Sequence, residues 1–193
     1  MNKSRLEAFS DGVLAIIITI MVLEMKVPHG SDWDQLKELI PVGISYLISF
    51  TCVGIYWGNH HHLLHTIRKV NSKKILLANL HLLFWLSLIP FASGWMGENH
   101  FAPNPVALYA IVFCMCGIAY AILQKIIFNT VNDESELKQA LEKQKGKVLF
   151  STICSFSAVI VAYLNPFVSL FLVLAQSVIW LIPDKNIERA LSD

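Results

Sequence analysis

The residues best placed to do chemistry lie at the start of the chain, in the segment Arg5–Asp11. Arg5, Ser10 and Asp11 precede a long apolar run that continues to Leu23. Ionisable groups in or near the hydrocarbon of a membrane are costly, so they are usually paired and usually functional. This arrangement predicts a membrane-spanning first helix with a polar site at its mouth.

The composition of the whole chain is that of an integral membrane protein. The chain has 193 residues, of which 55% are hydrophobic and 15% are charged, whereas a soluble domain carries roughly 25% charged residues. The net charge of +1 gives no indication of a nucleic-acid partner. The cysteines lie inside apolar segments without C-x-x-C spacing, so we interpret them as buried hydrophobic residues: Cys52, Cys114, Cys116 and Cys154.

Six segments are long and apolar enough to span a bilayer, which takes about 20 mostly apolar residues. Pro90 lies inside the third segment and predicts a kink there. The short break at Asn165-Pro166 predicts a tight hairpin between the last two. The sequence therefore predicts one all-α domain over residues 1–193, with spans at Phe9–Val27, Leu39–Gly58, Ile75–Trp95, Pro105–Phe128, Val148–Leu164 and Phe167–Leu181.

The charges of the loops predict the orientation. If both termini are cytoplasmic, the inner segments hold 13 of the 15 basic residues, and the outer segments hold only Lys26 and Lys37. A bias of this size is the positive-inside pattern of multi-pass membrane proteins. An even number of spans returns the chain to the same side, so the two predictions agree. The longest inner loop, residues 129–147, mixes both charge signs at helical spacing and is interpreted as a solvated amphipathic turn or two.

The first predicted helix has two distinct faces when it is projected at 100° per residue. An apolar stripe follows one face, and Asp11 points about 140° away from Ile16. The stripe either packs against neighbouring helices, which is the commoner role of such a face, or lines a narrow apolar pore. One chain has only one such helix, so the pore alternative requires an oligomer. The stripe comprises Phe9, Gly12, Val13, Ile16, Thr19, Ile20, Leu23 and Val27.

The pattern Arg5-x-x-x-Phe9-Ser10-Asp11, at the start of the first of six spans, resembles the signature of the transmembrane-protein-175 family of cation channels. The single six-span unit is similar to the prokaryotic branch of that family. The resemblance implies a homotetramer in the cell membrane, with four first helices around a central pore. It implies a potassium-permeable, weakly selective channel without a carbonyl selectivity filter. It implies no enzymatic activity and no cofactor other than the permeant K+.

The resemblance also implies roles for individual residues of the stripe. The constriction would begin at Ile16, five positions after the motif aspartate, and continue at Ile20 and Leu23. Thr19 stands at a position implicated in ion preference among prokaryotic members. Ala15 stands where some members carry a small hydroxyl residue, so only a modest preference for potassium over sodium is expected.

The motif residues are expected to hold the first helix in place, because a buried charge needs a partner and hydrogen bonds. Candidate partners lie at the inner ends of the second and third spans, where Trp57, Asn79 and several histidines can donate hydrogen bonds to Asp11. The resemblance implies such a joining role for Trp57, Asn79 and His81, opposite Arg5, Phe9, Ser10 and Asp11.

The histidines of the segment 60–65 raise other possibilities. His61 and His65 are four residues apart and could share a helix face, as zinc ligands do. The histidines outside this segment are isolated, so a metal site is the least favoured role for the cluster. Anchoring of the helix at the membrane interface is favoured, and modulation by pH ranks between the two. A membrane enzyme built on these histidines would lack a second ligand set.

The alternative function is a proton-coupled secondary transporter that uses Asp11 and the histidines. Such a transporter needs ionisable groups at mid-membrane and broken helices. Asp11 is predicted near the inner end of its helix, and only Pro90 interrupts a span. The channel is therefore the favoured function.

Overall fold

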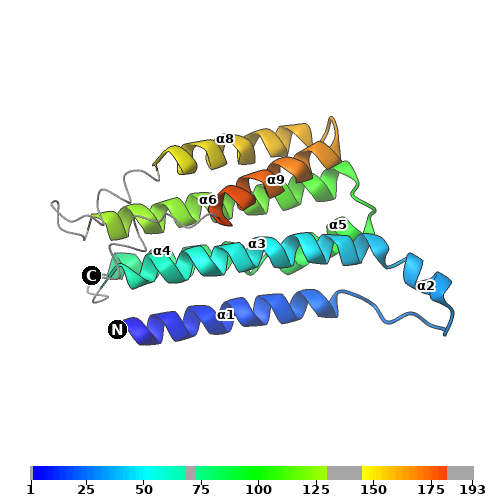
Figure 1. The fold of residues 1–193 in the computed structure, drawn as a ribbon, viewed down its shortest axis with the longest axis horizontal. Coiled ribbons are helices and arrows are strands. Elements are labelled where there is room, and N and C mark those ends of the chain that lie inside the picture. The colour runs from blue at the N-terminus through cyan, green and yellow to red at the C-terminus, as the bar shows by residue number, and fades with distance from the viewer. Residues whose placement is uncertain (1, 68–72, 130–144, 182–193) are drawn as a thin grey trace.

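The computed structural model describes residues 2–67, 73–129 and 145–181. The long helices lie side by side along the long axis of the molecule, and successive spans run in alternating directions, with α4 and α5 continuing one another (Figure 1). No strand forms among these residues, as predicted. Most of the loop interpreted as an amphipathic turn, residues 130–144, lies outside them. The helices are α1 (Lys3–Leu23), α2 (Trp33–Lys37), α3 (Ile40–His65), α4 (Lys73–Leu86), α5 (Ile89–Glu98), α6 (Pro103–Phe128), α8 (Lys145–Val161) and α9 (Pro166–Leu181).

Each of the six predicted spans corresponds to helical structure. Four helical stretches of the described chain are long and apolar enough to cross a membrane, namely α1, α3, α4 with α5, and α6. The helices α8 and α9 are apolar but shorter, with 17 and 16 residues. At 1.5 Å per residue each is about 25 Å long, close to the ~30 Å hydrocarbon thickness of a bilayer. The chain is therefore a multi-pass membrane protein.

The third predicted span is interrupted at Pro90. The helix α4 ends at Leu86, and α5 begins at Ile89. The backbone N–H of Leu88 donates to the carbonyl of Trp85 at 3.2 Å, three residues back instead of four. A proline has no N–H, and its ring clashes with the carbonyl four residues earlier, here that of Leu86. The predicted interruption is confirmed.

The last two helices form the predicted tight hairpin, because α8 ends at Val161 and α9 begins at Pro166. The side-chain oxygen Oδ1 of Asn165 accepts hydrogen bonds from the backbone N–H groups of Phe167 and Val168, at 3.0 and 3.3 Å. This is an N-cap followed by proline at the first helical position, the preferred start of a helix.

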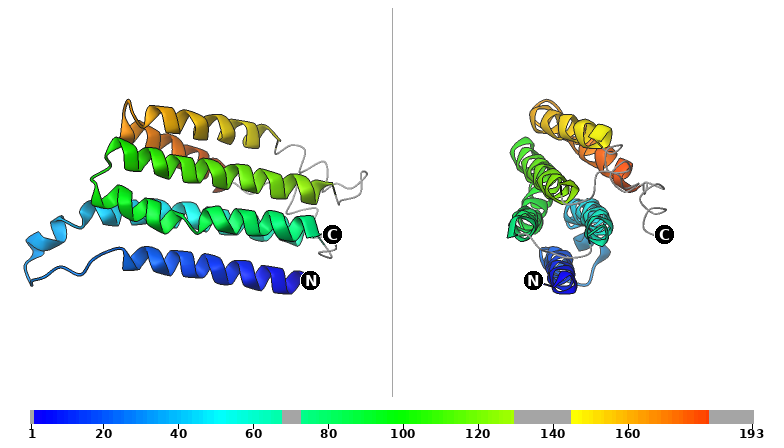
Figure 2. Two further views of the ribbon diagram at one scale, coloured as in Figure 1. Left: turned by 180° about the vertical axis from the view of Figure 1, so that it is seen from behind. Right: turned by 90° about the vertical axis from the view of Figure 1, so that its left-hand side faces the viewer.

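The helix α1 lies at one edge of the bundle. It contacts α3, α4 and α5, whereas α6 packs against α4, α5, α8 and α9 and forms the centre of the fold (Figure 2). One face of α1 is therefore buried, and much of the rest of its circumference is not covered by the described residues. The buried residues of α1 are Leu6, Ser10, Leu14, Ile17 and Met21.

A close approach between two helices involves Gly97 of α5. A Cβ atom added to Gly97 would lie 2.6 Å from Ser45 Oγ and 2.7 Å from Val42 Cα of α3. Next to it, Ser45 Oγ donates to the Ser93 carbonyl at 3.1 Å. Because one of the clashing atoms belongs to the backbone, a side chain here must push α3 and α5 apart.

We expect Gly97→Ala to destabilise the fold by about 1–3 kcal/mol, the usual cost of overpacking. The thermal unfolding of the detergent-purified protein measures this. Gly43→Ala is the matched control, because a Cβ at Gly43 meets no atom within 4 Å and alanine is the better helix former. Equal melting temperatures for the two variants would contradict the tight α3–α5 contact.

Candidate functional site

The two faces of α1 differ sharply in the structure. Leu14 is 1% exposed on the packed face, whereas Ile16 is 57% and Leu23 79% exposed on the predicted stripe. The two faces are centred roughly 120° apart on the helix. Most of the stripe is therefore not covered by the described residues of the single chain. The exposed members of the stripe are Phe9, Gly12, Ile16, Thr19, Ile20, Leu23 and Val27, whereas Val13 is half-buried.

Thr19 is the polar member of the exposed stripe. Its hydroxyl donates to the Ile16 carbonyl of the preceding turn at 2.9 Å. A hydroxyl has one hydrogen to donate and two lone pairs to accept with. Since the hydroxyl hydrogen is donated to the Ile16 carbonyl, the lone pairs of the oxygen remain available as acceptors. A cation is bound by such lone pairs.

A buried hydrogen-bond network joins α1 to α3 through α4. Asn79 Nδ2 donates to Ser10 Oγ at 2.9 Å, and Ser10 Oγ in turn donates to the Leu6 carbonyl at 2.9 Å. Asn79 Oδ1 lies 2.6 Å from Nε2 of His60; an amide oxygen can only accept, so His60 donates. Ser10, Asn79 and His60 are 0%, 0% and 2% exposed. Asn79 therefore joins α1 through Ser10 and not through Asp11.

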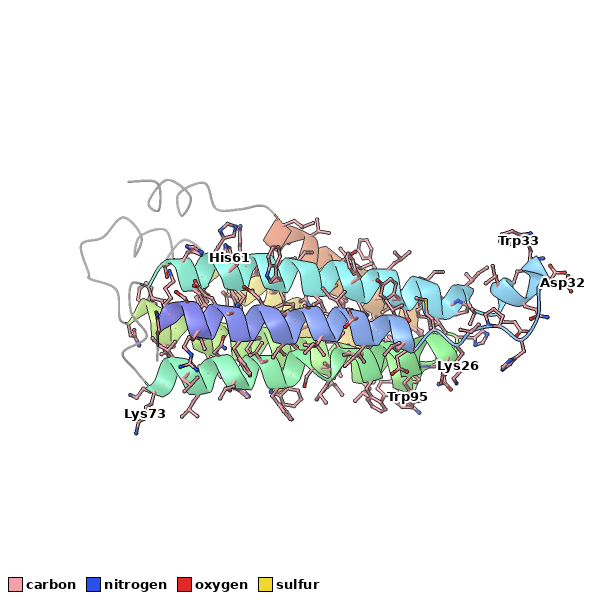
Figure 3. The ribbon with its side chains drawn as sticks, turned by 90° about the horizontal axis from the view of Figure 1, so that it is seen from below. Lys26, Asp32, Trp33, His61, Lys73 and Trp95 are labelled. Carbon is pink, nitrogen blue, oxygen red and sulfur yellow. The ribbon has the colours of Figure 1, made fainter. Side chains whose placement is uncertain are left out.

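Of the predicted partners, Trp57 is the one that reaches Asp11. Its indole Nε1 donates to Asp11 Oδ1 at 3.0 Å. The ring of His61, one turn further along α3, stacks on the indole with centroids 6.0 Å apart. The carboxylate is thus held against α3 and away from the exposed apolar stripe, and α1 lies between α3 on one side and α4 with α5 on the other (Figure 3).

Asp11→Ala is expected to weaken the attachment of α1, because the hydrogen bond from Trp57 to a charged acceptor contributes about 1.5–3 kcal/mol. We expect a smaller fraction of assembled protein in size-exclusion chromatography of the detergent extract. Asp11→Asn keeps an acceptor oxygen and is the conservative control. Normal assembly of Asp11→Ala with unchanged ion flux would overturn the role given to this carboxylate.

Three sequence candidates lie outside the network. The side chains of Arg5 and Phe9 are exposed, with no hydrogen bond or ion pair to the residues that the structure describes. His81 Nε2 accepts a hydrogen bond from Nε1 of Trp85 at 2.9 Å, within α4 itself. His81 is therefore not brought to α1. The histidine that does face Asn79 is His60, three residues after Trp57. This spacing puts both side chains on the same side of a helix, so the sequence contained a signal for His60.

Charged groups attach the first turn of α1 to the end of α3. Lys3 Nζ lies 3.7 Å from Glu7 Oε1, and His65 Nε2 lies 3.9 Å from the same oxygen. The rings of His61 and His65 are 4.4 Å apart, so the two residues share a helix face. Within the described ranges, however, no group of three histidine, cysteine or acidic side chains could hold a metal ion.

At the opposite end of the bundle, Lys26 follows α1 and Glu98 ends α5. Lys26 Nζ lies 2.5 Å from Glu98 Oε1, and this hydrogen-bonded carboxylate raises the pKa of Lys26. The pair is exposed, so it contributes little to stability. The ion pair nevertheless connects the segment after α1 to α5, one of the helices that pack against the buried face of α1.

Comparisons with known proteins agree with this architecture. Residues 5–90 match the family model described as endosomal/lysosomal potassium channel TMEM175. A potassium channel from Chryseobacterium sp. (strain P1-3) is 51% identical over 193 residues, which is 100% of both chains. A potassium channel from Streptomyces collinus is 33% identical over 132 residues, 64% of each chain. The crystal structure of a lysosomal potassium-selective channel TMEM175 homologue from Chamaesiphon minutus shares the fold, with a TM-score of 0.79 and 22% identity, covering 93% of this chain and 96% of that one.

Proposed function

Because this chain belongs to the TMEM175 family of potassium channels, we propose that it forms a potassium-permeable cation channel in which α1 of each copy lines a shared pore. The observation that carries the proposal is the exposed stripe of α1. Ile16, Ile20 and Leu23 are 57%, 40% and 79% exposed in the single chain, while the opposite side of the same helix is held by buried contacts. The 51% identity to a potassium channel over the whole chain supports the choice of ion.

The proposed assembly is a homotetramer of six-span subunits, with residues 1–193 as one domain. A single α1 cannot enclose a pore, so several copies must contribute one helix each. The alternating directions of the helices support an even number of spans (Figure 1). In this topology 13 of the 15 basic residues lie on one side, and the positive-inside rule supports a cytoplasmic location of both termini in a cell membrane.

The proposed constriction consists of rings of Ile16, Ile20 and Leu23. A ring of aliphatic side chains removes water from an ion without offering carbonyl oxygens in return. Such a pore discriminates weakly among monovalent cations. Thr19 lies between the first two rings in sequence and presents acceptor lone pairs, so its hydroxyl is the proposed origin of the preference for potassium.

The motif contacts would fix the orientation of this pore helix. Ser10 and Asp11 bond to α4 and α3, respectively, and both point away from the stripe. Rotation of α1 about its own axis would break both bonds. The network thereby keeps the aliphatic residues, and not the carboxylate, facing the proposed conduction path.

A reversal-potential measurement tests the proposed function. The protein, reconstituted in planar bilayers with KCl on one side and NaCl on the other, should conduct with a reversal potential displaced toward the potassium equilibrium value but short of it. The proton-coupled transporter alternative predicts potassium flux only with a pH gradient. Absence of conductance above that of protein-free bilayers would refute the channel.

A further inference from the structure

A cavity of about 50 Å³ lies on the side of α3 away from α1. It is lined by four helices, α3, α6, α8 and α9. It is separate from the exposed stripe and from the network around Asn79. The residues that determine its chemistry are Tyr56 and Asn59 of α3, Gly117 of α6, Val148 of α8, and Gln176 and Trp180 of α9.

The cavity lies near one surface of the bilayer. Val148 is in the first turn of α8, which begins at Lys145, and Trp180 is in the last turn of α9, which ends at Leu181. Both positions are within about one 5.4 Å turn of the helix ends. Tryptophan is enriched at the membrane–water interface. The cavity is therefore within reach of molecules that gather at the head-group level, on the side that the proposed orientation makes cytoplasmic.

Polar atoms around the cavity lack partners. Gln176 is 6% exposed; its Oε1 accepts from Ser155 Oγ at 2.7 Å, but its amide Nε2 has no partner in the described part of the chain. Asn59 donates through Nδ2 to the carbonyls of Ile55 and Trp180, at 2.8 and 3.0 Å, which leaves its Oδ1 unmatched there. A bound molecule that accepts from Gln176 Nε2 and donates to Asn59 Oδ1 would satisfy both amides.

The rest of the lining restricts the class of that molecule. Among the described residues, the lining contains no charged side chain that would compensate a charged ligand. Apolar walls such as Ile55, Ile118 and Val148 surround the polar atoms. A water molecule would form hydrogen bonds with the amides but would make no favourable contact with these apolar side chains. A volume of about 50 Å³ exceeds the ~10–15 Å³ that a cavity needs to hold one water, and it accommodates a hydroxyl with its first carbons.

We propose that this cavity binds the hydroxyl end of a small uncharged amphiphile, an alcohol, with its hydroxyl between Gln176 and Asn59 and its carbon chain against the apolar walls. A hydroxyl is both donor and acceptor, which matches the two unpartnered amide atoms. A free alcohol and the glycerol hydroxyl of a neutral lipid share this chemistry.

Photolabelling of the full-length protein in phosphatidylcholine vesicles tests the proposal, with a diazirine derivative of hexanol as the probe. We expect saturable labelling of peptides that contain Tyr56 or Trp180, abolished by excess hexanol. Competition by diacylglycerol in the vesicles as well as by hexanol identifies a lipid source, and competition by hexanol alone identifies a free alcohol. Labelling that does not saturate and falls only on exposed positions of α8 and α9 would overturn the proposal.

Gly117→Ala provides the cavity-filling variant. Its Cβ would lie 3.8 Å from Tyr56 Oη, an ordinary contact, so the methyl group fits and occupies ligand space. Since one methyl group in a pocket changes affinity by about tenfold or more, labelling should fall about tenfold. Gly43→Ala adds the same methyl in open space on α3 and should label like the unmodified protein. Equal labelling of the two variants would contradict binding in the cavity.

Gln176→Leu separates hydroxyl recognition from simple partitioning into the membrane. This variant should lose labelling by the hexanol probe but retain any labelling by a diazirine hexane that lacks the hydroxyl. Loss or retention of both probes together would show that the amide does not recognise a hydroxyl. These experiments require no ion flux, so their failure is distinguishable from failure of the proposed channel function.

Discussion

Replacing Ile16 with serine is expected to increase potassium flux through the reconstituted protein by about tenfold or more and to reduce its preference for potassium over sodium. Each copy in the proposed tetramer contributes one Ile16 side chain to the narrowest ring. Removal of these aliphatic groups lets water accompany the ion, and each 1.36 kcal/mol removed from the barrier increases the rate about tenfold. Stopped-flow or electrode-monitored potassium efflux from vesicles measures the effect.

The chain contains a closely matched control for this experiment. Ile153 of α8 is also an isoleucine and is also 57% exposed, but it belongs to a helix far from α1 (Figure 1). If the stripe of α1 only faced lipid, Ile16→Ser and Ile153→Ser would have the same effect on flux. We expect Ile153→Ser to leave the flux unchanged. Equal responses would show that Ile16 does not line the conduction path.

Asn79→Ala is expected to have the largest effect on stability. The substitution removes the hydrogen bond to Ser10 of α1 and the one from His60 of α3, and it leaves the buried His60 donor unpaired. Each buried group left without its partner costs about 1–3 kcal/mol, so we expect a loss of about 2–4 kcal/mol. Thermal unfolding in detergent and the fraction of oligomer in size-exclusion chromatography should both report it.

Asn99→Ala is the control for the asparagine substitution. Asn99 is exposed, and its Nδ2 donates to the Trp95 carbonyl of its own helix at 2.8 Å, so its loss should change the melting temperature little. A double-mutant cycle with Ser10→Ala isolates the contact between Ser10 and Asn79, because residues in one network give non-additive effects. Strictly additive losses would contradict the hydrogen bond between them.

Helical periodicity and turn chemistry were sufficient to predict the long helices and their interruptions, but not the short helix α2. The break at Pro90 and the hairpin at Asn165-Pro166 depend on local backbone chemistry, which a sequence contains in full. The separation of Ile16 from the packed face of α1 follows from the 100° repeat alone. The membership of the stripe was predictable from the same repeat, but its exposure was not, because an apolar helix face more commonly packs against other helices.

The pairing of polar side chains was only partly predictable. Several donors occur at the inner ends of α3 and α4, and the rotation of those helices about their axes decides which donor meets which acceptor. His81 instead bonds to Trp85, four residues further along the same helix, where the local spacing already provides a partner. His60 takes the place beside Asn79. The cavity around Gln176 depends on four helices at once, and no short sequence pattern describes it.

The most direct test of the central claim, that α1 lines the conduction path, is the current of an Ile16→Cys variant exposed to a cationic thiol reagent. The native cysteines Cys52, Cys114, Cys116 and Cys154 are all buried, so the unmodified protein serves as the insensitive background. The account predicts that the reagent blocks the potassium current of Ile16→Cys and leaves that of the unmodified protein intact. A potassium current through Ile16→Cys that persists after complete modification of the new thiol would contradict it.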